Sequence, residues 1–228
     1  MHLKHAFTWP KAADPNDDQH ARGDTFALSD GASISYDSAL WAQIVCKCYV
    51  QSPHVTQDWL DACIKEFNTY HDRATMPWHK EAAFDRGSFA SLLGVRLTST
   101  AIHIDAIGDS LAVLCDGNVR KDCFPYREVE QFDQAPMLLC TDRAKNPIFA
   151  DGVLADKWMH DWPLEQLQSP RLLCMTDALG RCLLSREGND STEKLFSLET
   201  QEAFAQFVLD EREASRLKRD DTTLLVFW

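Results

Sequence analysis

Four apolar runs in this chain end on aspartate or lie just beside it, and this pattern limits the possible folds more than any other feature. The runs are 25–29, 102–107, 171–176 and 224–228, and the neighbouring acids are Asp30, Asp109, Asp177 and Asp220. Each run reads as a buried strand whose carboxylate emerges at the edge of a core. One Asp-Gly pair such as Asp30-Gly31 is usually an ordinary turn. Four acids gathered together are costly without a cation, so the pattern predicts an oxygen-ligand site for magnesium or manganese.

The spacing of the other apolar residues predicts an α+β fold. Helical periodicity occurs in 38–50, 55–70 and 199–217, and Thr56 is expected to cap the second of these helices poorly. Segment 71–86 is expected to be a loop or a third short helix. Strands are expected at 5–9, 89–97, 100–106, 111–115 and 118–124 in hairpin order, and short turns between strands indicate antiparallel pairing.

Length and charge narrow the class of protein. A chain of 228 residues with 45% hydrophobic residues favours one domain, 1–228, with a sizeable core. The formal net charge of −12 argues against nucleic acid as a partner. No apolar run approaches the roughly 20 residues that span a bilayer, and the first residues do not resemble a signal peptide. We therefore expect a cytoplasmic protein without a membrane partner.

The eight cysteines do not indicate a redox or zinc site. None of them forms a Cys-x-x-Cys pair, and most lie within apolar runs. A thiol in such a run behaves as a small hydrophobic group. We expect most of them to be reduced, buried and inert.

Taken together, the motifs resemble the type 2C metal-dependent serine/threonine protein phosphatases, most closely their compact bacterial members. The likeness spans 16–227, and it rests on the order of six short motifs: Asn16-Asp17-Asp18, Phe26-Ala27-Leu28-Ser29-Asp30-Gly31, Gly87-Ser88-Phe89-Ala90, Gly108-Asp109-Ser110, Leu173-Cys174-Met175-Thr176-Asp177 and Asp220-Asp221-Thr222-Thr223. The resemblance implies an αββα sandwich of two antiparallel β-sheets flanked by helices. It also implies hydrolysis of phosphoserine or phosphothreonine in a phosphorylated protein substrate, and a cognate Ser/Thr kinase as a possible partner.

The resemblance assigns roles at the site. Two Mn²⁺ or Mg²⁺ ions would be joined by Asp30, assisted by the Gly31 carbonyl, and a water or hydroxide between the ions would attack phosphorus. Asp177 and Asp220 would hold the first ion with Asp30, and these three are the expected catalytic residues. Asp109 would share a third ion with Asp177. Two further metal-ligand candidates, which could equally close an Asx turn, are Asp17 and Asp18.

The chain departs from the family pattern at several positions. Ala13 stands where the family usually has a phosphate-gripping arginine, and Lys4, Lys11 and Arg22 are possible substitutes. Ala32 replaces the histidine that serves as general acid in eukaryotic members, and Ala178 replaces a glycine. In the family a variable flap precedes the Asp177 motif, which suggests substrate contacts here for Trp158, Trp162 and the Asp151-Gly152 turn.

Three other functions have some support in the residue types of this chain. A cysteine-nucleophile phosphatase needs Cys-x5-Arg, but Cys174 and Arg181 have six residues between them. A calcium-binding loop would need the spacing Asp-x-Asp-x-Asp-Gly, and no run in the sequence has it. The altered arginine and glycine positions keep open a catalytically weak, phosphatase-like binding or regulatory module.

Overall fold

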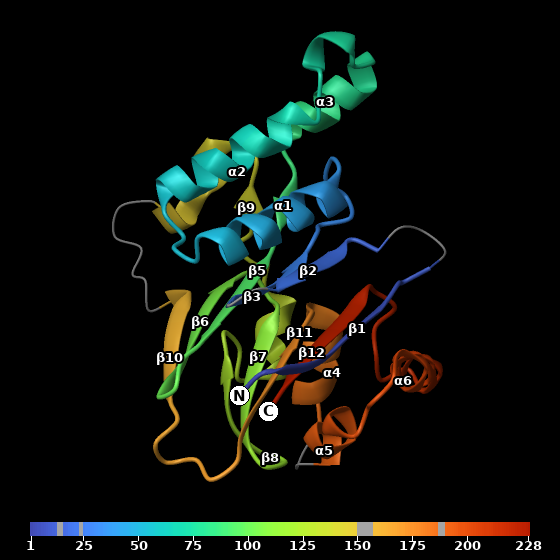
Figure 1. Cartoon of the computed structure of the whole chain (residues 1–228). Helices are drawn as coiled ribbons and strands as arrows, with labels where there is room; N and C mark the ends of the chain where they lie inside the picture. The colour runs from blue at the N-terminus through green and yellow to red at the C-terminus, as the bar shows by residue number, and fades with distance from the viewer. Residues whose placement is uncertain (13–15, 23–24, 150–156, 187–189) are drawn as a thin grey trace.

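The strand segments carry apolar residues at successive positions. Because successive side chains point to opposite faces of a sheet, both faces must be buried. The computed structural model describes residues 1–12, 16–22, 25–149, 157–186 and 190–228. It provides the cover by packing two five-stranded antiparallel sheets face to face. Helices lie on the outer side of each sheet, so that four layers follow one another in Figure 1. The predicted αββα sandwich is confirmed.

Strands from distant parts of the chain alternate within both sheets. The first sheet has the order β10 (Met159–Pro163), β6 (Ala101–Ile107), β5 (Leu92–Leu97), β3 (Thr25–Asp30) and β2 (Asp18–Arg22). The second has the order β1 (Leu3–Trp9), β12 (Thr222–Phe227), β11 (Pro170–Met175), β7 (Leu111–Asp116) and β8 (Val119–Phe124). A further pair is formed by β4 (Phe89–Ala90) and β9 (Leu139–Cys140). Because β1 pairs with β12, the two termini lie side by side (Figure 1).

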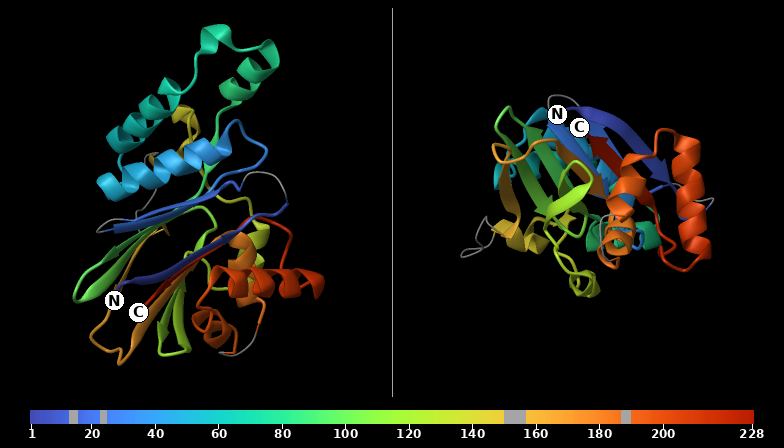
Figure 2. Two further views of the ribbon diagram at one scale, coloured as in Figure 1. Left: turned by 45° about the vertical axis from the view of Figure 1, so that its right-hand side comes forward. Right: turned by 90° about the horizontal axis from the view of Figure 1, so that it is seen from below.

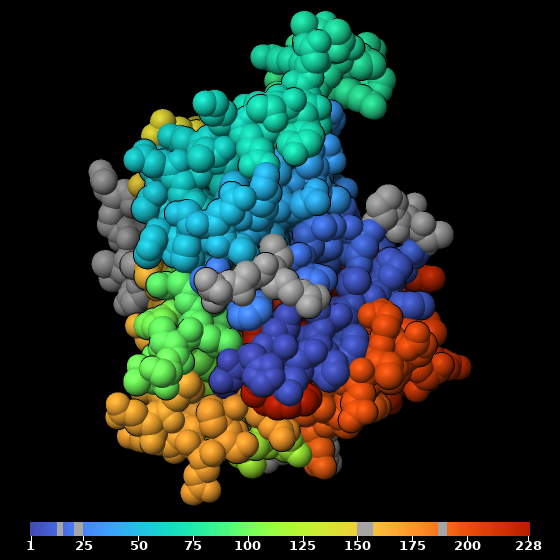
Figure 3. Space-filling view, viewed as in Figure 1, coloured from blue at the N-terminus to red at the C-terminus, as the bar shows by residue number. Residues whose placement is uncertain are grey.

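Two helical layers cover the sandwich. The first sheet is covered by α1 (Ser38–Gln51), and α2 (Gln57–Thr69) packs outside it. The second sheet is covered by α4 (Asp177–Leu184), α5 (Asp190–Phe196) and α6 (Gln201–Glu213). Figure 2 shows these layers from two more sides, and α3 (Trp78–Arg86) projects beyond α2 in Figure 3. Short 3-10 turns occur at Arg73–Thr75, Val129–Asp133, Arg143–Lys145 and Pro147–Phe149.

Three apolar clusters hold the layers together. One lies between the two sheets and includes Leu28, Ile104 and Leu225. The other two lie between each sheet and its helices, where Trp41 of α1 and Phe204 of α6 are fully buried. All eight cysteines are buried and free, as expected. None of the described helices is long and apolar enough to cross a membrane.

The structure corrects two of the helix predictions. Thr56 does cap α2, because its side chain accepts a hydrogen bond from the Trp59 amide at 3.2 Å. The helix expected over 199–217 ends at Glu213. Ser215 adopts a left-handed conformation with φ 57°, and the Leu217 amide donates to the Glu211 carbonyl at 3.1 Å. This turn places Leu217 in the core instead of extending α6.

The strand predictions for 89–115 also need correction. The expected strand 89–97 is interrupted at Ser91, which separates β4 from β5. The expected hairpin between 100–106 and 111–115 does not form, since β6 belongs to the first sheet and β7 to the second. Gly108 makes this change of sheet with φ 111°, and a Cβ at this residue would lie 2.6 Å from the Ser91 Cβ.

Candidate metal centre

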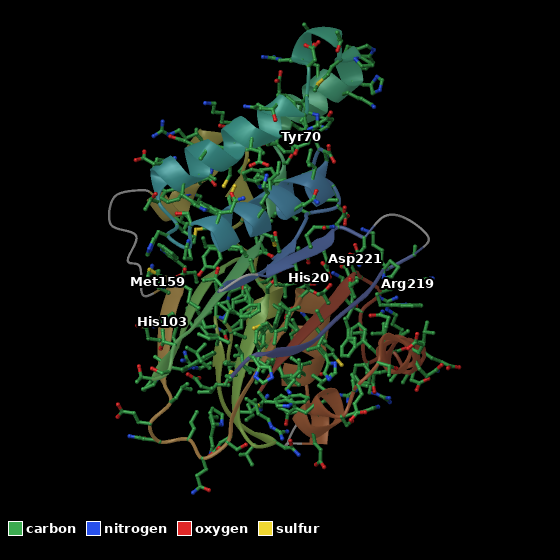
Figure 4. The ribbon with its side chains drawn as sticks, in the orientation of Figure 1. His20, Tyr70, His103, Met159, Arg219 and Asp221 are labelled. Carbon is green, nitrogen blue, oxygen red and sulfur yellow. The ribbon has the colours of Figure 1, made fainter. Side chains whose placement is uncertain are left out.

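The predicted acids come from strand ends of both sheets. Asp30 ends β3, and its register partner on β2 is Asp18. Asp109 lies in the connection from β6 to β7, Asp177 is the first residue of α4, and Asp220 precedes β12. These acids lie at the end of the sandwich where Figure 4 labels Asp221. His103 and Met159 lie at the opposite side.

The pKa of Asp30 shows that these acids lie close enough for their charges to interact. Burial raises the pKa of Asp30 well above its usual range, and the charges of Asp18, Asp177, Asp109 and Asp220 raise it further. Five carboxylates from both sheets therefore share one neighbourhood. Such an arrangement destabilises the ionised state unless cations offset the charge.

Asp18 is the most deeply buried member of this group. Its Oδ2 accepts hydrogen bonds from the Thr223 hydroxyl at 2.8 Å and the Thr176 hydroxyl at 3.1 Å. Burial is the main reason that its pKa rises to about 8. The second oxygen, Oδ1, is buried and has no hydrogen-bond partner within the described residues. Burial likewise raises the pKa of Asp109 to about 6.

Ser91 holds Asp30 in place, and the sequence analysis did not identify this residue. The Ser91 amide donates to the Asp30 carbonyl at 2.8 Å, and the Ser91 hydroxyl accepts from the Asp30 amide at 2.9 Å. The neighbouring Ser29 hydroxyl donates to the Ser91 carbonyl at 2.6 Å. Gly31 is required by close packing, because a Cβ there would lie 2.7 Å from the Ser38 carbonyl oxygen. The backbone around Asp30 is thus fixed from two sides.

Lys218 is a cation that the sequence analysis also missed. Its Nζ lies 2.8 Å from Asp220 Oδ2 and 3.9 Å from Asp177 Oδ2. The hydrogen bond to Asp220 is the main cause of the raised pKa of Lys218. The sequence feature that could have identified it is its position two residues before Asp220. In this structure Lys218 neutralises part of the charge that the predicted ligands carry.

Asp17 and Asp221 lie beside the buried group. Asp17 is ion-paired with Lys11 at 3.1 Å and accepts a hydrogen bond from the Ser38 hydroxyl. The Asp221 carboxylate accepts from the amides of Lys11 and Asp17 at 2.7 and 2.8 Å. Asp221 therefore ties the segment before β2 to β12, and Asp17 faces a basic neighbour.

The donor set suits a hard divalent cation, although its oxygens do not converge. Within the described residues, no group of three or more His, Cys, Asp or Glu side chains is positioned to hold a metal ion. The neighbourhood nevertheless supplies several carboxylate oxygens, including the unpartnered Asp18 Oδ1, and the carboxylates repel one another. Oxygen ligands with uncompensated negative charge are what Mg²⁺ and Mn²⁺ prefer. The residues fit such an ion by donor type and charge.

Several predicted contacts are not at this site. Trp158 and Trp162 are buried in the apolar clusters, and the Trp162 indole donates to Asp122, so neither is a substrate contact. The reason is β10, which pairs with β6 and places this segment against the core. Lys4 lies over the Trp228 ring, away from the acids. Cys174 is fully buried, and burial raises the pKa of its thiol, which makes it a poor nucleophile.

Three of the sequence predictions lie outside what the structure describes. Ala13 and the Asp151-Gly152 turn fall in segments outside the described residues, and the Arg22 side chain is not described either. Of the three proposed substitutes for the phosphate-binding arginine, Lys11 is thus the one that the structure locates beside the acids.

Known proteins were compared with the chain in sequence and in structure. No family model matches it, and no curated protein shows significant sequence similarity. A bacterial serine phosphatase superposes with a TM-score of 0.63 at 15% identity, over 99% of this chain and 97% of that one. The serine/threonine phosphatase Stp1 from Staphylococcus aureus gives a TM-score of 0.60 at 16% identity, over 100% and 95% of the two chains.

A third similar structure is the serine/threonine phosphatase PstP/Ppp of Mycobacterium tuberculosis. It has a TM-score of 0.57 at 17% identity, and the match covers 97% of this chain and 96% of that one. The catalytic domain of PstP has also been solved in complex with two manganese ions. These likenesses show that the chain has the fold of the bacterial type 2C serine/threonine phosphatases.

Proposed function

We propose that the chain is a metal-dependent protein phosphatase that hydrolyses phosphoserine and phosphothreonine, with 1–228 forming one domain. The observation that carries the proposal is the group of carboxylates around Asp30, gathered from the ends of strands in both sheets. The phosphatase fold supports it, and so does the manganese complex of the PstP catalytic domain. The substrate would be a phosphorylated protein, and the enzyme could oppose a Ser/Thr kinase.

Each acid has a proposed role in holding two Mn²⁺ or Mg²⁺ ions. Asp30 would contact both ions, the Gly31 carbonyl would be a further ligand, and Asp177 and Asp220 would complete the first position. The second position would be held from the side of β2, where Asp17 and Asp18 lie. Asp109, which contributes to the charge around Asp30, would serve a third ion together with Asp177.

When bound, the ions would supply an activated water and neutralise the phosphoryl oxygens. The residues of the chain orient these groups. Ser91 fixes the Asp30 backbone through two hydrogen bonds. Thr176 and Thr223 direct one oxygen of Asp18, which leaves the other available. Lys11 lies beside Asp17 and is the nearest described candidate to contact a substrate phosphate from that side.

A second candidate function is a phosphatase-like binding module without turnover. The ion pairs of Lys218 with Asp220 and Asp177 favour it, because these two acids would have to exchange a lysine partner for a metal ion. Hydrolysis of a phosphothreonine peptide in saturating Mn²⁺, with and without chelator, tests both functions. The phosphatase predicts turnover that the chelator abolishes. Metal binding by calorimetry without turnover would favour the binding module, and turnover that resists chelation would contradict both.

A further inference from the structure

A large basic pocket lies between α4, α6 and the segment that follows α6. Its volume is about 1020 Å³. Among the described residues that line it there is one carboxylate, Glu213, and the basic side chains are Arg181, Arg186, Arg212, Arg216, Lys218 and Arg219. The chain as a whole has a net charge of −12. A concentration of positive charge on an acidic protein produces a local field that attracts anions.

Part of this charge is neutralised by carboxylates. Arg181 pairs with Asp133 at 2.6 Å. Arg186 and Arg216 both contact Glu211, which is buried beneath the pocket. These pairs use two carboxylates for three arginines, so positive charge remains.

Arg212 and Arg219 form no ion pair within the described residues. The Arg212 guanidinium donates to the carbonyl oxygens of Pro10 and Asp220, and its Nε is buried without a partner in the described residues. Arg219 Nε donates to the Lys11 carbonyl at 3.3 Å. Carbonyl groups orient these arginines but do not cancel their charge. Burial, and then the charge of Arg219, lowers the pKa of Arg212, whereas the charges of Asp221 and Asp220 raise it, so Arg212 lies in the field of one cation and two carboxylates.

The pocket adjoins the candidate metal centre. Lys218 lines the pocket and also pairs with Asp220 and Asp177. Ala178, the residue after Asp177, lines it as well. In Figure 4 Arg219 lies beyond Asp221, on the side of the molecule that α6 occupies. A peptide with its phosphorylated residue at the acids would therefore pass neighbouring residues into the basic pocket.

We propose that this pocket binds acidic or additionally phosphorylated residues that flank the phosphorylated residue of the substrate. The proposal rests on the proposed function and specifies its substrate class as acidic phosphopeptides. The planar guanidinium group binds carboxylates and phosphates through two parallel hydrogen bonds, and five of the six cations are arginines. The volume exceeds what a single small anion needs, and it accommodates several side chains of a peptide.

Binding can be measured separately from hydrolysis. The metal-free protein would be titrated against two fluorescently labelled phosphothreonine peptides, one flanked by glutamates and the other by glutamines, with fluorescence anisotropy as the readout. The test variant is Arg181→Gln combined with Arg219→Gln. The matched control is Arg73→Gln combined with Arg143→Gln, since it also removes two exposed arginine charges, both of them ion-paired and away from the pocket.

The wild-type protein should bind the glutamate peptide about tenfold more tightly than the glutamine peptide, and the preference should weaken with salt. The test variant should lose most of this preference, whereas the control variant should keep it. With Mn²⁺, the test variant should raise KM for the glutamate peptide while kcat changes less than about twofold.

Two results would overturn the pocket proposal: equal binding of the two peptides, or an unchanged preference in a test variant that is folded by circular dichroism. Tighter binding of a single-stranded RNA of equal charge would also overturn it. A wild-type protein that shows the binding preference but hydrolyses neither peptide would refute the phosphatase and leave the anion pocket standing.

Discussion

Two groups of buried acids in this molecule have opposite electrostatic environments. In the first, a single acid, Glu211 of α6, is surrounded by three basic partners: Arg186, Lys194 and Arg216. Burial alone would raise the pKa of Glu211, but the hydrogen bonds from Arg216 and Lys194 and the charge of Arg186 lower it to about 2. Around Asp30 the balance is reversed, because burial and four neighbouring carboxylates all raise the pKa.

The comparison separates an acid that stabilises the fold from acids that the fold tolerates. Glu211 joins α6 to α5, to Arg186 in the segment after α4 and to Arg216 in the segment after α6, and its charge is compensated within the chain. The acids around Asp30 have Lys218 as a nearby cation, and it contacts two of them. Their remaining charge is what a bound dication would offset. The following predictions test this distinction.

Asp30→Asn should nearly abolish hydrolysis. The amide keeps the shape of the side chain but removes the charge that would hold two ions together, and we expect a loss of about 10³-fold in turnover, roughly 4 kcal/mol. The measurement is the rate on a phosphothreonine peptide in saturating Mn²⁺. Equal rates for the two proteins would mean that Asp30 is only a turn residue, since Asn-Gly forms turns as readily as Asp-Gly.

Glu211→Gln should instead reduce stability and leave the metal centre intact. Breaking a buried ion pair costs about 3–5 kcal/mol, but Lys194 and Arg216 are about half exposed and can return to water, so we expect about 2 kcal/mol. Urea unfolding of the metal-free protein measures this loss. An unchanged midpoint would contradict the stabilising role, and Gln206→Ala on the same helix is a suitable surface control.

The stability of the metal-free protein should depend on pH in two opposite ways. Asp18 has a raised folded pKa of about 8, so its favourable contribution is present below about pH 4 and is lost as the pH rises through 8. Glu211 has a lowered folded pKa, so its contribution is present above about pH 4.5 and is lost toward pH 2. We expect stability to decrease between pH 5 and 8, by at most about 1.4 kcal/mol per pH unit for the proton that Asp18 loses.

Asp18→Asn provides the control for this pH dependence. It should reduce the slope between pH 5 and 8 and leave the part that Asp30 and Asp109 contribute, and Glu211→Gln should leave the slope unchanged. Unfolding midpoints in urea at several pH values decide the matter. A slope that Asp18→Asn does not alter would show that Asp18 does not contribute to the pH dependence.

Asp109→Ala should have the smallest effect of the four. Asp109 lies in the connection between the two sheets, and it would serve the third ion rather than the two central ones. We expect about a fivefold drop in turnover, roughly 1 kcal/mol, with tight binding of two ions retained. Calorimetry that shows loss of all tight metal binding in this variant would place Asp109 among the central ligands.

Apolar periodicity predicted the helices and strands because it reports which faces are buried, and the family resemblance supplied their arrangement in layers. It did not predict that β6 and β7 lie in different sheets, because the change depends on the conformation of Gly108 rather than on hydrophobicity. The end of α6 was missed for a similar reason, since Leu217 continues the apolar pattern but reaches the core through the left-handed turn at Ser215.

The acids around Asp30 could be named from the sequence because they recur at strand ends. Ser91 and Lys218 could not, because their importance depends on contacts across the fold. Ser91 reaches Asp30 only when β3 and β5 are paired, and Lys218 reaches Asp177 only when α4 packs beside the segment before β12. The basic pocket was missed for the same reason, since its cations come from both α4 and the region around the end of α6.

The register of β2 against β3 has a consequence for local motion. Asp18 and Asp30 are directly opposite each other, and β2 is the last strand on its side of the first sheet. Like charges facing across a strand pair weaken the pairing, and a strand with one neighbour opens more readily than one with two. Amide hydrogens of β2 should therefore exchange with solvent faster than those of β5, and a dication between the two carboxylates should slow that exchange selectively. The hydrogen-exchange rate of β2 would then report whether metal is bound, without any substrate present.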